Sequence, residues 1–221
     1  MNFLGIDTSS DVISISFSLK GEIVLDFNHY LPKSASIALV YIDKFLKKFS
    51  CKLKDFHALV VGIGPGSFTG LRVSCSITKA FSLSLNVPII AIGSFYSLAT
   101  PFKEKHSKIA VISDAKRNLI YATSFLVKGN RLRREKKENL YSLNEFLKGK
   151  EDYFFVTTHQ FLRQKIKEIN PSISFFPKDV KPKAAHLVSL AREYYQQGRF
   201  TPINKLEPLY IYSKECQIKN V

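Results

Sequence analysis

The chain contains no tryptophan, a single methionine and only three cysteines among its 221 residues. Cys51, Cys75 and Cys216 form no CxxC pair and lie near no cluster of histidines, so the sequence indicates neither a disulfide framework nor a zinc site. No two of the five histidines lie within five residues of each other, which excludes the HExxH motif of zinc peptidases. Scattered cysteines of odd number favour a reducing compartment.

Long apolar runs are also missing. No apolar stretch approaches the ~20 residues that a membrane-spanning helix needs. Residues 1–7 include no basic segment, and Asp7 interrupts their apolar run, so we expect no secretory signal. The sequence therefore predicts a cytoplasmic protein that does not enter a membrane.

Acidic residues are scarce, since 18 Asp and Glu oppose 33 Lys and Arg and give a net charge of +15. The excess is uneven: residues 1–100 carry +3 (9 basic, 6 acidic), and residues 101–221 carry +12 (24 basic, 12 acidic). A basic second half suits a polyanionic partner such as RNA, because binding releases counterions. The alternative is a lysine-rich surface that reflects genome composition or serves solubility alone.

Four of the ten glycines fall within nine residues, in the segment from Gly62 to Gly70 that also includes Gly64 and Gly66. The segment follows an apolar run and precedes a helix-like stretch, where free backbone amides can bind an anion. It is not a P-loop, because Leu71 and Arg72 follow Gly70, and it is not a dinucleotide fingerprint, because Ser67 occupies the place of the third glycine. Either the loop contacts a phosphate, or its glycines let two backbones pack closely.

Two acidic residues, Asp7 and Asp114, each follow an apolar strand-like run. An acid at the end of a strand can orient a metal-bound nucleotide or a water molecule. It can equally cap the turn that follows it. The weak candidates for a ligand site are the following residues: Asp7, Thr8, Gly64, Gly66, Ser67 and Arg72.

Apolar patterning predicts an α/β fold in which helices flank mixed sheets. We expect a meander of three strands up to residue 27, with residues 12–19 half-buried, and then helices over 34–49 and 68–85. A second strand-and-loop unit begins after the polar stretch 100–106. We therefore expect one lobe over 1–100, and a second over 101–221 that includes a final helix at 184–197 and a tail packing back on the body. Residues 128–137 are interpreted as a basic turn.

The helix expected at 34–49 is apolar over most of its circumference, which indicates burial on more than one side. Either two layers of this chain or a partner chain covers it. The helix at 68–85 carries only two charged residues, Arg72 and Lys79, and its small side chains permit close helix packing.

Several motifs together resemble the TsaB (YeaZ-type) family over nearly the whole chain. They are Gly5-Ile6-Asp7-Thr8-Ser9, the glycine segment extended to Arg72, Asp114-Ala115-Lys116-Arg117 with Tyr121, and Pro208-Leu209-Tyr210. The resemblance implies a degenerate two-lobed fold of the actin-like, Hsp70-like ATPase type. It also implies a non-catalytic subunit that docks on a TsaD-like transferase, which makes N6-threonylcarbamoyladenosine at position 37 of tRNAs reading ANN codons.

The resemblance further implies a TsaE-like ATPase as a partner. We expect indirect or weak contact with tRNA, and the sequence leaves open whether the chain forms a homodimer when its partner is absent. We expect no tightly bound cofactor and no metal, although ATP or ADP can bind at the interface of the complex. The predicted partner interface comprises Ile37, Tyr41, Phe45, Leu71, Val73 and Ile77. An active nucleotide-dependent ATPase or phosphotransferase using Asp7 and Thr8 is the alternative function, and a metallopeptidase is disfavoured.

Overall fold

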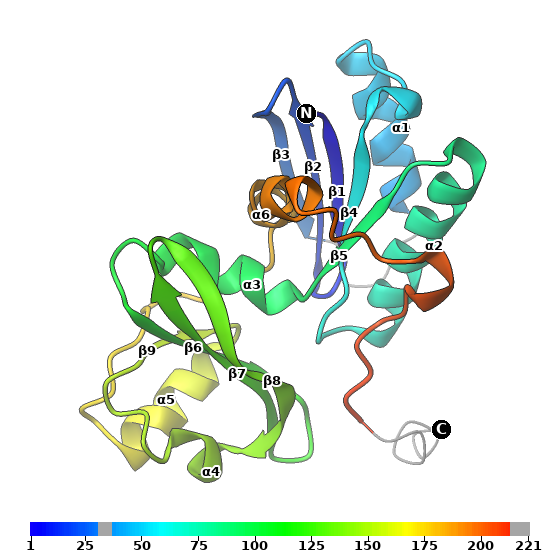
Figure 1. The fold of residues 1–221 in the computed structure, drawn as a ribbon. Helices are drawn as coiled ribbons and strands as arrows, with labels where there is room; N and C mark the ends of the chain where they lie inside the picture. Colours follow the sequence, from blue (N-terminus) through cyan, green and yellow to red (C-terminus); the bar gives the residue numbers. More distant parts are fainter. Residues whose placement is uncertain (31–36, 213–221) are drawn as a thin grey trace. The chain divides into compact units, whose positions relative to one another are not determined.

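The computed structural model describes residues 1–30 and 37–212. The chain forms two compact units, one from residues 1–97 with 182–209 and the other from residues 98–181 with 210–212 of the described chain (Figure 1). The predicted boundary near residue 100 agrees with this division. The predicted place of the last helix is wrong, because that helix belongs to the first unit.

A five-stranded mixed sheet forms the centre of the first unit, in the order β3-β2-β1-β4-β5. Its strands are β1 (Phe3–Asp7), β2 (Val12–Leu19), β3 (Glu22–Tyr30), β4 (Ala58–Gly62) and β5 (Ile89–Ile92). The first three are antiparallel neighbours, whereas β4 and β5 run parallel to β1. The predicted meander and mixed sheet are confirmed.

Helices α1 (Ala38–Lys48) and α2 (Phe68–Leu85) cover one face of this sheet (Figure 1). Alternate residues of β1 and β2, such as Leu4 and Ile15, pack there against Ile42 of α1 and Ile77 of α2. The bounds of α2 match the prediction because Ser67 accepts a hydrogen bond from the Gly70 amide and so caps the helix. The predicted cap of the first helix at Ser34 or Ser36 lies outside the described residues.

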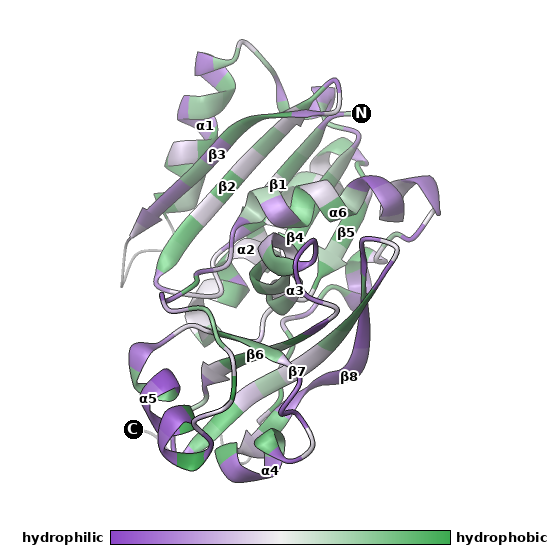
Figure 2. Cartoon of the chain, turned by 90° about the vertical axis from the view of Figure 1, so that its left-hand side faces the viewer, coloured by the Kyte–Doolittle hydropathy of each residue, from purple (hydrophilic) through white to green (hydrophobic). Residues whose placement is uncertain are grey.

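Helix α6 (Ala184–Gln196) covers the opposite face, where Leu187, Val188 and Ala191 pack against β1, β4 and β5. This helix corrects the expectation that β2 is half-buried. Isoleucines and serines alternate along β2, as its banded colour in Figure 2 shows, but Ser14 and Ser16 are buried beneath α6 as fully as the isoleucines opposite. Small hydroxyl side chains let the helix approach this face of the sheet.

A four-stranded sheet, in the order β8-β7-β6-β9, organises the second unit. Its strands are β6 (Lys108–Asp114), β7 (Leu119–Lys128), β8 (Arg131–Ser142) and β9 (Phe154–Thr157). Its helices are α4 (Leu143–Leu147) and α5 (Gln160–Ile169), and Phe146, Leu162 and Ile166 from them pack against Ala110, Ile112 and Phe155 of the sheet. Residues 131–137 belong to strand β8, so their interpretation as a basic turn is wrong.

The remaining elements are short. They are α3 (Ser94–Ala99) and the 3-10 helices at Leu53–Asp55, Thr100–Phe102 and Ile203–Lys205. The tail packs back as predicted: Leu206 is buried beside Val61 and Cys75, and the Leu209 amide donates to the Ile63 carbonyl at 2.8 Å. Among the helices of the described residues, none has the length and apolar character to cross a membrane.

Candidate functional site

The glycine segment lies directly against the loop that joins β1 to β2. An ideal Cβ atom would lie 1.9 Å from the Thr8 carbonyl oxygen if placed on Gly70, and 2.0 Å from the Ser9 carbonyl oxygen if placed on Gly66. At Gly62 it would lie 1.9 Å from Oδ2 of Asp7. Only glycine permits these approaches. Of the two alternatives that the sequence left open for this segment, the structure shows the close packing of two backbones.

Hydrogen bonds connect the same two loops. The Ser67 amide donates to the Ser9 carbonyl at 2.7 Å, and the Thr8 hydroxyl donates to the Gly70 carbonyl at 2.6 Å. The Gly64 amide donates to Oγ of Ser94 at 3.0 Å. The backbone amides of Gly64 and Ser67, which a phosphate-binding loop would offer to its ligand, thus donate to other groups of the protein.

Asp7 is fully buried at the centre of this contact. Its Oδ1 accepts hydrogen bonds from the amide of Ser9 at 2.8 Å and from its hydroxyl at 2.6 Å, whereas Oδ2 is buried without a hydrogen-bond partner among the described residues. Burial raises the pKa of Asp7 more than the hydrogen bonds from Ser9 lower it. The contact to the amide two residues on is that of an acid capping its own turn.

Asp114 is placed similarly in the second unit. Its Oδ1 accepts from the Lys116 amide at 3.0 Å, and its Oδ2 lies 2.8 Å from Nζ of Lys116. Burial raises the pKa of Asp114, but the hydrogen bonds and charge of Lys116 outweigh it, so the pKa lies below its ordinary value. The turn-capping interpretation of Asp114 is confirmed.

Of the six candidate ligand-site residues, five lie together in the contact between the glycine segment and the β1–β2 loop. Arg72 does not join them: it is exposed on α2, with its guanidinium carbon 3.8 Å from the centre of the Phe68 ring. Its side chain lines a groove on the surface instead.

This groove, of about 360 Å³, lies between α1 and α2. Leu39 of α1 lines one side, and α2 contributes Phe68, Thr69, Arg72, Val73, Ser76 and Ile77. Apolar side chains on the two helices are open to solvent: Leu39 is 47% exposed, Val40 63%, Phe68 42% and Leu83 72%. We call these four residues the α1–α2 surface.

The predicted interface residues divide into two groups. Phe45 and Leu71 are buried in the first unit, so the expectation that they present a surface to a partner is wrong for these two. Ile77 is also largely buried, but it lines the groove between α1 and α2. Ile37, Tyr41 and Val73 are half-buried at the margin of the core. The assignment of the interface to these two helices stays a prediction. Apolar patterning did not separate inward-facing from outward-facing positions, because α1 is apolar on more than one side and α2 carries few charged residues.

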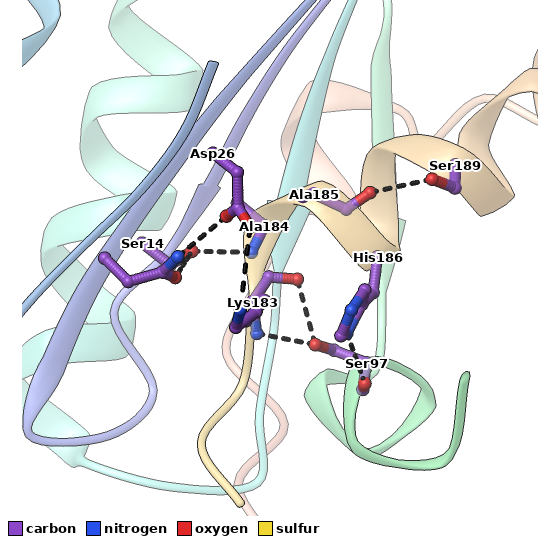
Figure 3. Close-up of polar contacts among 9 residues, drawn as sticks. Ser14, Asp26, Ser97, Lys183, Ala184, Ala185, His186 and Ser189 are labelled. Atoms are coloured by element: carbon purple, nitrogen blue, oxygen red, sulfur yellow. Dashed lines mark hydrogen bonds and ion pairs between the residues drawn. The ribbon is translucent and has the colours of Figure 1, made fainter. Parts of the chain in front are cut away.

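A polar cluster that the sequence did not indicate surrounds the start of α6 (Figure 3). Ser14 Oγ accepts a hydrogen bond from the Ala184 amide at 2.7 Å, and Nζ of Lys183 lies 3.6 Å from Asp26. Ser97 Oγ accepts from the Lys183 amide at 2.6 Å and donates to the Lys183 carbonyl at 2.9 Å. These hydrogen-bonded pairs are 86 to 170 positions apart, so no local pattern could have identified them.

The histidine of this cluster, His186, places Nδ1 2.8 Å from the Ser97 carbonyl oxygen. Burial lowers the pKa of His186, although its hydrogen bond to Ser97 opposes the shift. Both contacts of Ser97 Oγ are with backbone atoms of Lys183, so the hydroxyl fixes the start of α6. Across residues 1–30 and 37–212, no three His, Cys, Asp or Glu side chains are grouped so that they could hold a metal ion.

Comparisons with known proteins agree with this fold and these motifs. A family model described as tRNA N6-adenosine threonylcarbamoyltransferase (TsaD) matches residues 32–198, and the chain belongs to this family. The chain is 26% identical over 227 residues to the tRNA threonylcarbamoyladenosine biosynthesis protein TsaB of Bacillus subtilis, covering 99% of this chain and 97% of that one. The protein of the same name from Buchnera aphidicola subsp. Schizaphis graminum is 33% identical over 146 residues, 64% of this chain and 69% of that one.

Solved structures show the same architecture. YeaZ from Pseudomonas aeruginosa superposes with a TM-score of 0.80 at 20% identity, over 95% of this chain and 100% of that one. A Bacteroides thetaiotaomicron protein with an actin-like ATPase fold and unknown function gives 0.51 at 11% identity, over 85% and 95% of the two chains. The predicted resemblance to TsaB (YeaZ-type) proteins and the predicted actin-like fold are confirmed.

Proposed function

We propose that this chain is the partner subunit that docks on a TsaD-type threonylcarbamoyltransferase and activates it to form N6-threonylcarbamoyladenosine at position 37 of tRNAs reading ANN codons. The names of its relatives support a role in threonylcarbamoyladenosine biosynthesis. The packing of the glycine segment on its own chain supports a positioning role for that loop.

One observation carries the proposal: the α1–α2 surface leaves large apolar side chains in water on two adjacent helices. Leu83 is 72% exposed and Val40 63%. Burying these side chains against a partner would stabilise the complex by ~25 cal/mol per Å² of apolar area removed from water. The groove beside Leu39 offers a concave seat for a side chain from a facing helix. An exposed apolar patch of this kind is typical of a protein interface.

The test is a binding measurement between the purified chain and its TsaD-type subunit. Leu39→Asp places a charge in the groove, and we expect the dissociation constant to rise at least 100-fold, because burying an unpaired charge costs ~3 kcal/mol or more. Light scattering of the unsubstituted mixture should give a 1:1 complex.

Ile169→Asp is the matched control. Ile169 is 45% exposed at the end of α5 in the second unit, close to the 47% of Leu39, so the change in chemistry is the same while the place differs. We expect this variant to bind normally. Normal binding of Leu39→Asp, or equal weakening by both variants, would reject the α1–α2 surface as the docking site.

A TsaE-like ATPase as a further partner and a homodimer in the absence of the TsaD-type subunit belong to the same proposal. A homodimer through the α1–α2 surface would also be disrupted by Leu39→Asp, which sedimentation of the isolated chain measures. Binding of ATP or ADP stays a prediction for the assembled complex. Calorimetry of the isolated chain with ATP and Mg²⁺ tests the alternative of an active ATPase, for which micromolar binding lost in Asp7→Ala would be required.

A further inference from the structure

Arginine is concentrated in one short stretch of this lysine-rich chain. Of its 33 basic residues only eight are arginines, and three of these, Arg131, Arg133 and Arg134, fall within four positions. A basic surface that reflects genome composition or solubility would carry lysine here as it does elsewhere. The guanidinium group differs from an ammonium because it offers a planar fork of donors that matches a phosphate group.

Strand β8 holds these arginines at the edge of the second sheet, where β7 is its one neighbour among the described strands. Figure 2 shows β8 in the colour of hydrophilic residues along much of its length. Within residues 128–137 six basic side chains oppose one acid, Glu135. Charged side chains also keep an edge strand from pairing with other chains, so their direction on the sheet is what distinguishes a binding surface from simple protection.

The pairing register gives that direction. Lys128 pairs with Arg131, and Leu126, two positions before Lys128, pairs with Arg133. Paired residues point to the same side of a sheet, as do residues two apart on a strand. Lys128, Arg131 and Arg133 therefore share one side of the hairpin, and all three are exposed. We call these three residues the β8 cationic face.

The two acids of the strand, one exposed and one buried, are both bonded within the second unit. Glu135 lies at a register shift of the β7–β8 ladder and accepts hydrogen bonds from Ser124 at 2.6 Å and Tyr153 at 2.8 Å. Glu138 is buried and forms an ion pair with Arg134 at 2.7 Å. The hydrogen bond from Ser124 lowers the pKa of Glu135, which keeps the carboxylate charged and fixed in place. Both carboxylates of the strand are thus bonded to groups of the second unit, and the side chains of Lys128, Arg131 and Arg133 are exposed.

We propose that the β8 cationic face binds the phosphate backbone of the tRNA substrate, so that the second unit contacts RNA directly. Its three residues are anchored on sheet backbone, at positions ~6.6 Å apart along a strand and ~4.8 Å apart across the pair, so that their side chains can reach neighbouring phosphates. The choice of tRNA as the nucleic acid rests on the proposed function. The binding of phosphate by this face does not.

The test measures binding of the full chain to a fluorescein-labelled, unmodified transcript of an ANN-reading tRNA by anisotropy, over a series of salt concentrations. Arg131→Gln/Arg133→Gln removes two charges from the face. Each phosphate contact contributes a factor of about five at 0.1 M salt, so we expect affinity to fall about 25-fold and the slope of log K against log salt to decrease by about 1.4.

Lys54→Gln/Lys205→Gln is the control, because it removes the same charge from exposed positions of the first unit. We expect it to change affinity less than threefold. Equal losses in the two double variants would mean that net charge alone attracts RNA, and unchanged binding of Arg131→Gln/Arg133→Gln would place the contact elsewhere. Either result overturns the proposal. Binding of both chains to phosphatidylserine vesicles is measured as well. If Arg131→Gln/Arg133→Gln loses binding to the vesicles but keeps binding to tRNA, the face contacts lipid headgroups rather than RNA, and the proposal is also overturned.

The same variant separates this inference from the proposed function. Arg131→Gln/Arg133→Gln should still form the 1:1 complex with the TsaD-type subunit, because it leaves the α1–α2 surface intact. If the variant forms the 1:1 complex and its affinity for tRNA is unchanged, only the inference about the β8 cationic face fails. If no complex forms with the unsubstituted chain, the proposed function fails, and the tRNA measurement on the isolated chain still decides whether the face binds phosphate.

Discussion

Replacing Gly70 by alanine should destabilise the protein, although helix propensity alone predicts the opposite. Gly70 is the third residue of α2, where alanine is favoured over glycine by ~1 kcal/mol. The added Cβ would lie 1.9 Å from the Thr8 carbonyl oxygen, a backbone atom that cannot rotate away. The two loops must therefore separate.

Two costs oppose the gain in propensity. Forcing extra volume into a packed contact costs ~1–3 kcal/mol. Separation also breaks the hydrogen bond from Thr8 Oγ1 to the Gly70 carbonyl, 2.6 Å long and buried, at ~1–3 kcal/mol. After subtraction of the propensity term, we expect the free energy of unfolding to fall by about 3 kcal/mol, which lowers the melting temperature by ~6–12 °C.

Urea unfolding followed by circular dichroism measures this change, and position 76 supplies the control. Ser76 is exposed on the same helix, so Ser76→Ala should be more stable than Ser76→Gly by ~1 kcal/mol. Glycine would then be more stable than alanine at position 70, and alanine more stable than glycine at position 76. A Gly70→Ala variant as stable as the unsubstituted chain would refute the argument that the glycines exist for close packing.

Two further predictions concern buried titratable groups. Because burial raises the pKa of Asp7, the stability associated with its neutral form is complete below its ordinary value of 3.8 and is lost as pH rises through the raised pKa. Asp7→Asn should therefore gain stability relative to the unsubstituted chain between pH 4 and pH 8 in urea unfolding, and a constant difference across this range would contradict the assignment. Burial likewise raises the pKa of Cys75 to about 11, so at pH 8 iodoacetamide should modify Cys75 only after urea is added. Mass spectrometry measures this, and fast labelling of the folded chain would contradict the buried position.

Sequence reasoning identified most elements of the fold because their signals are local. The bounds of α2 follow from the Ser67 cap at one end and Asn86, in a left-handed conformation, at the other. Strand β8 was missed because residues 131–137 are charged almost without interruption and show no alternation of apolar residues. Its strand conformation depends on pairing with β7, which is a tertiary interaction.

The place of α6 could not be read from its own residues. An amphipathic helix shows which of its faces is buried, but not which sheet covers that face. One signal lies far away in the chain. A Cβ atom on Gly5 would lie 2.5 Å from Cγ2 of Val188, so the glycine in this buried strand indicates where α6 packs on the sheet. For the site, the sequence predicted close packing of the glycine segment only as one of two alternatives, since close packing and phosphate binding both call for glycine. It did not indicate that the backbone packed against the segment is that of Thr8 and Ser9.

The first unit is made from residues 1–97 and 182–209, and the sheet and helices of the second unit lie between these two segments in the sequence. All the residues of β6 to α5 therefore leave the ribosome before those of α6. The sheet of the second unit can form while one face of the first unit's sheet is still uncovered. Ser14, Ser16 and the apolar face of β1 remain exposed to solvent until α6, which ends at Gln196, has left the ribosome. A nascent chain paused near residue 180 should thus be a target for chaperones at its first sheet, although that sheet was the earliest part to be synthesised.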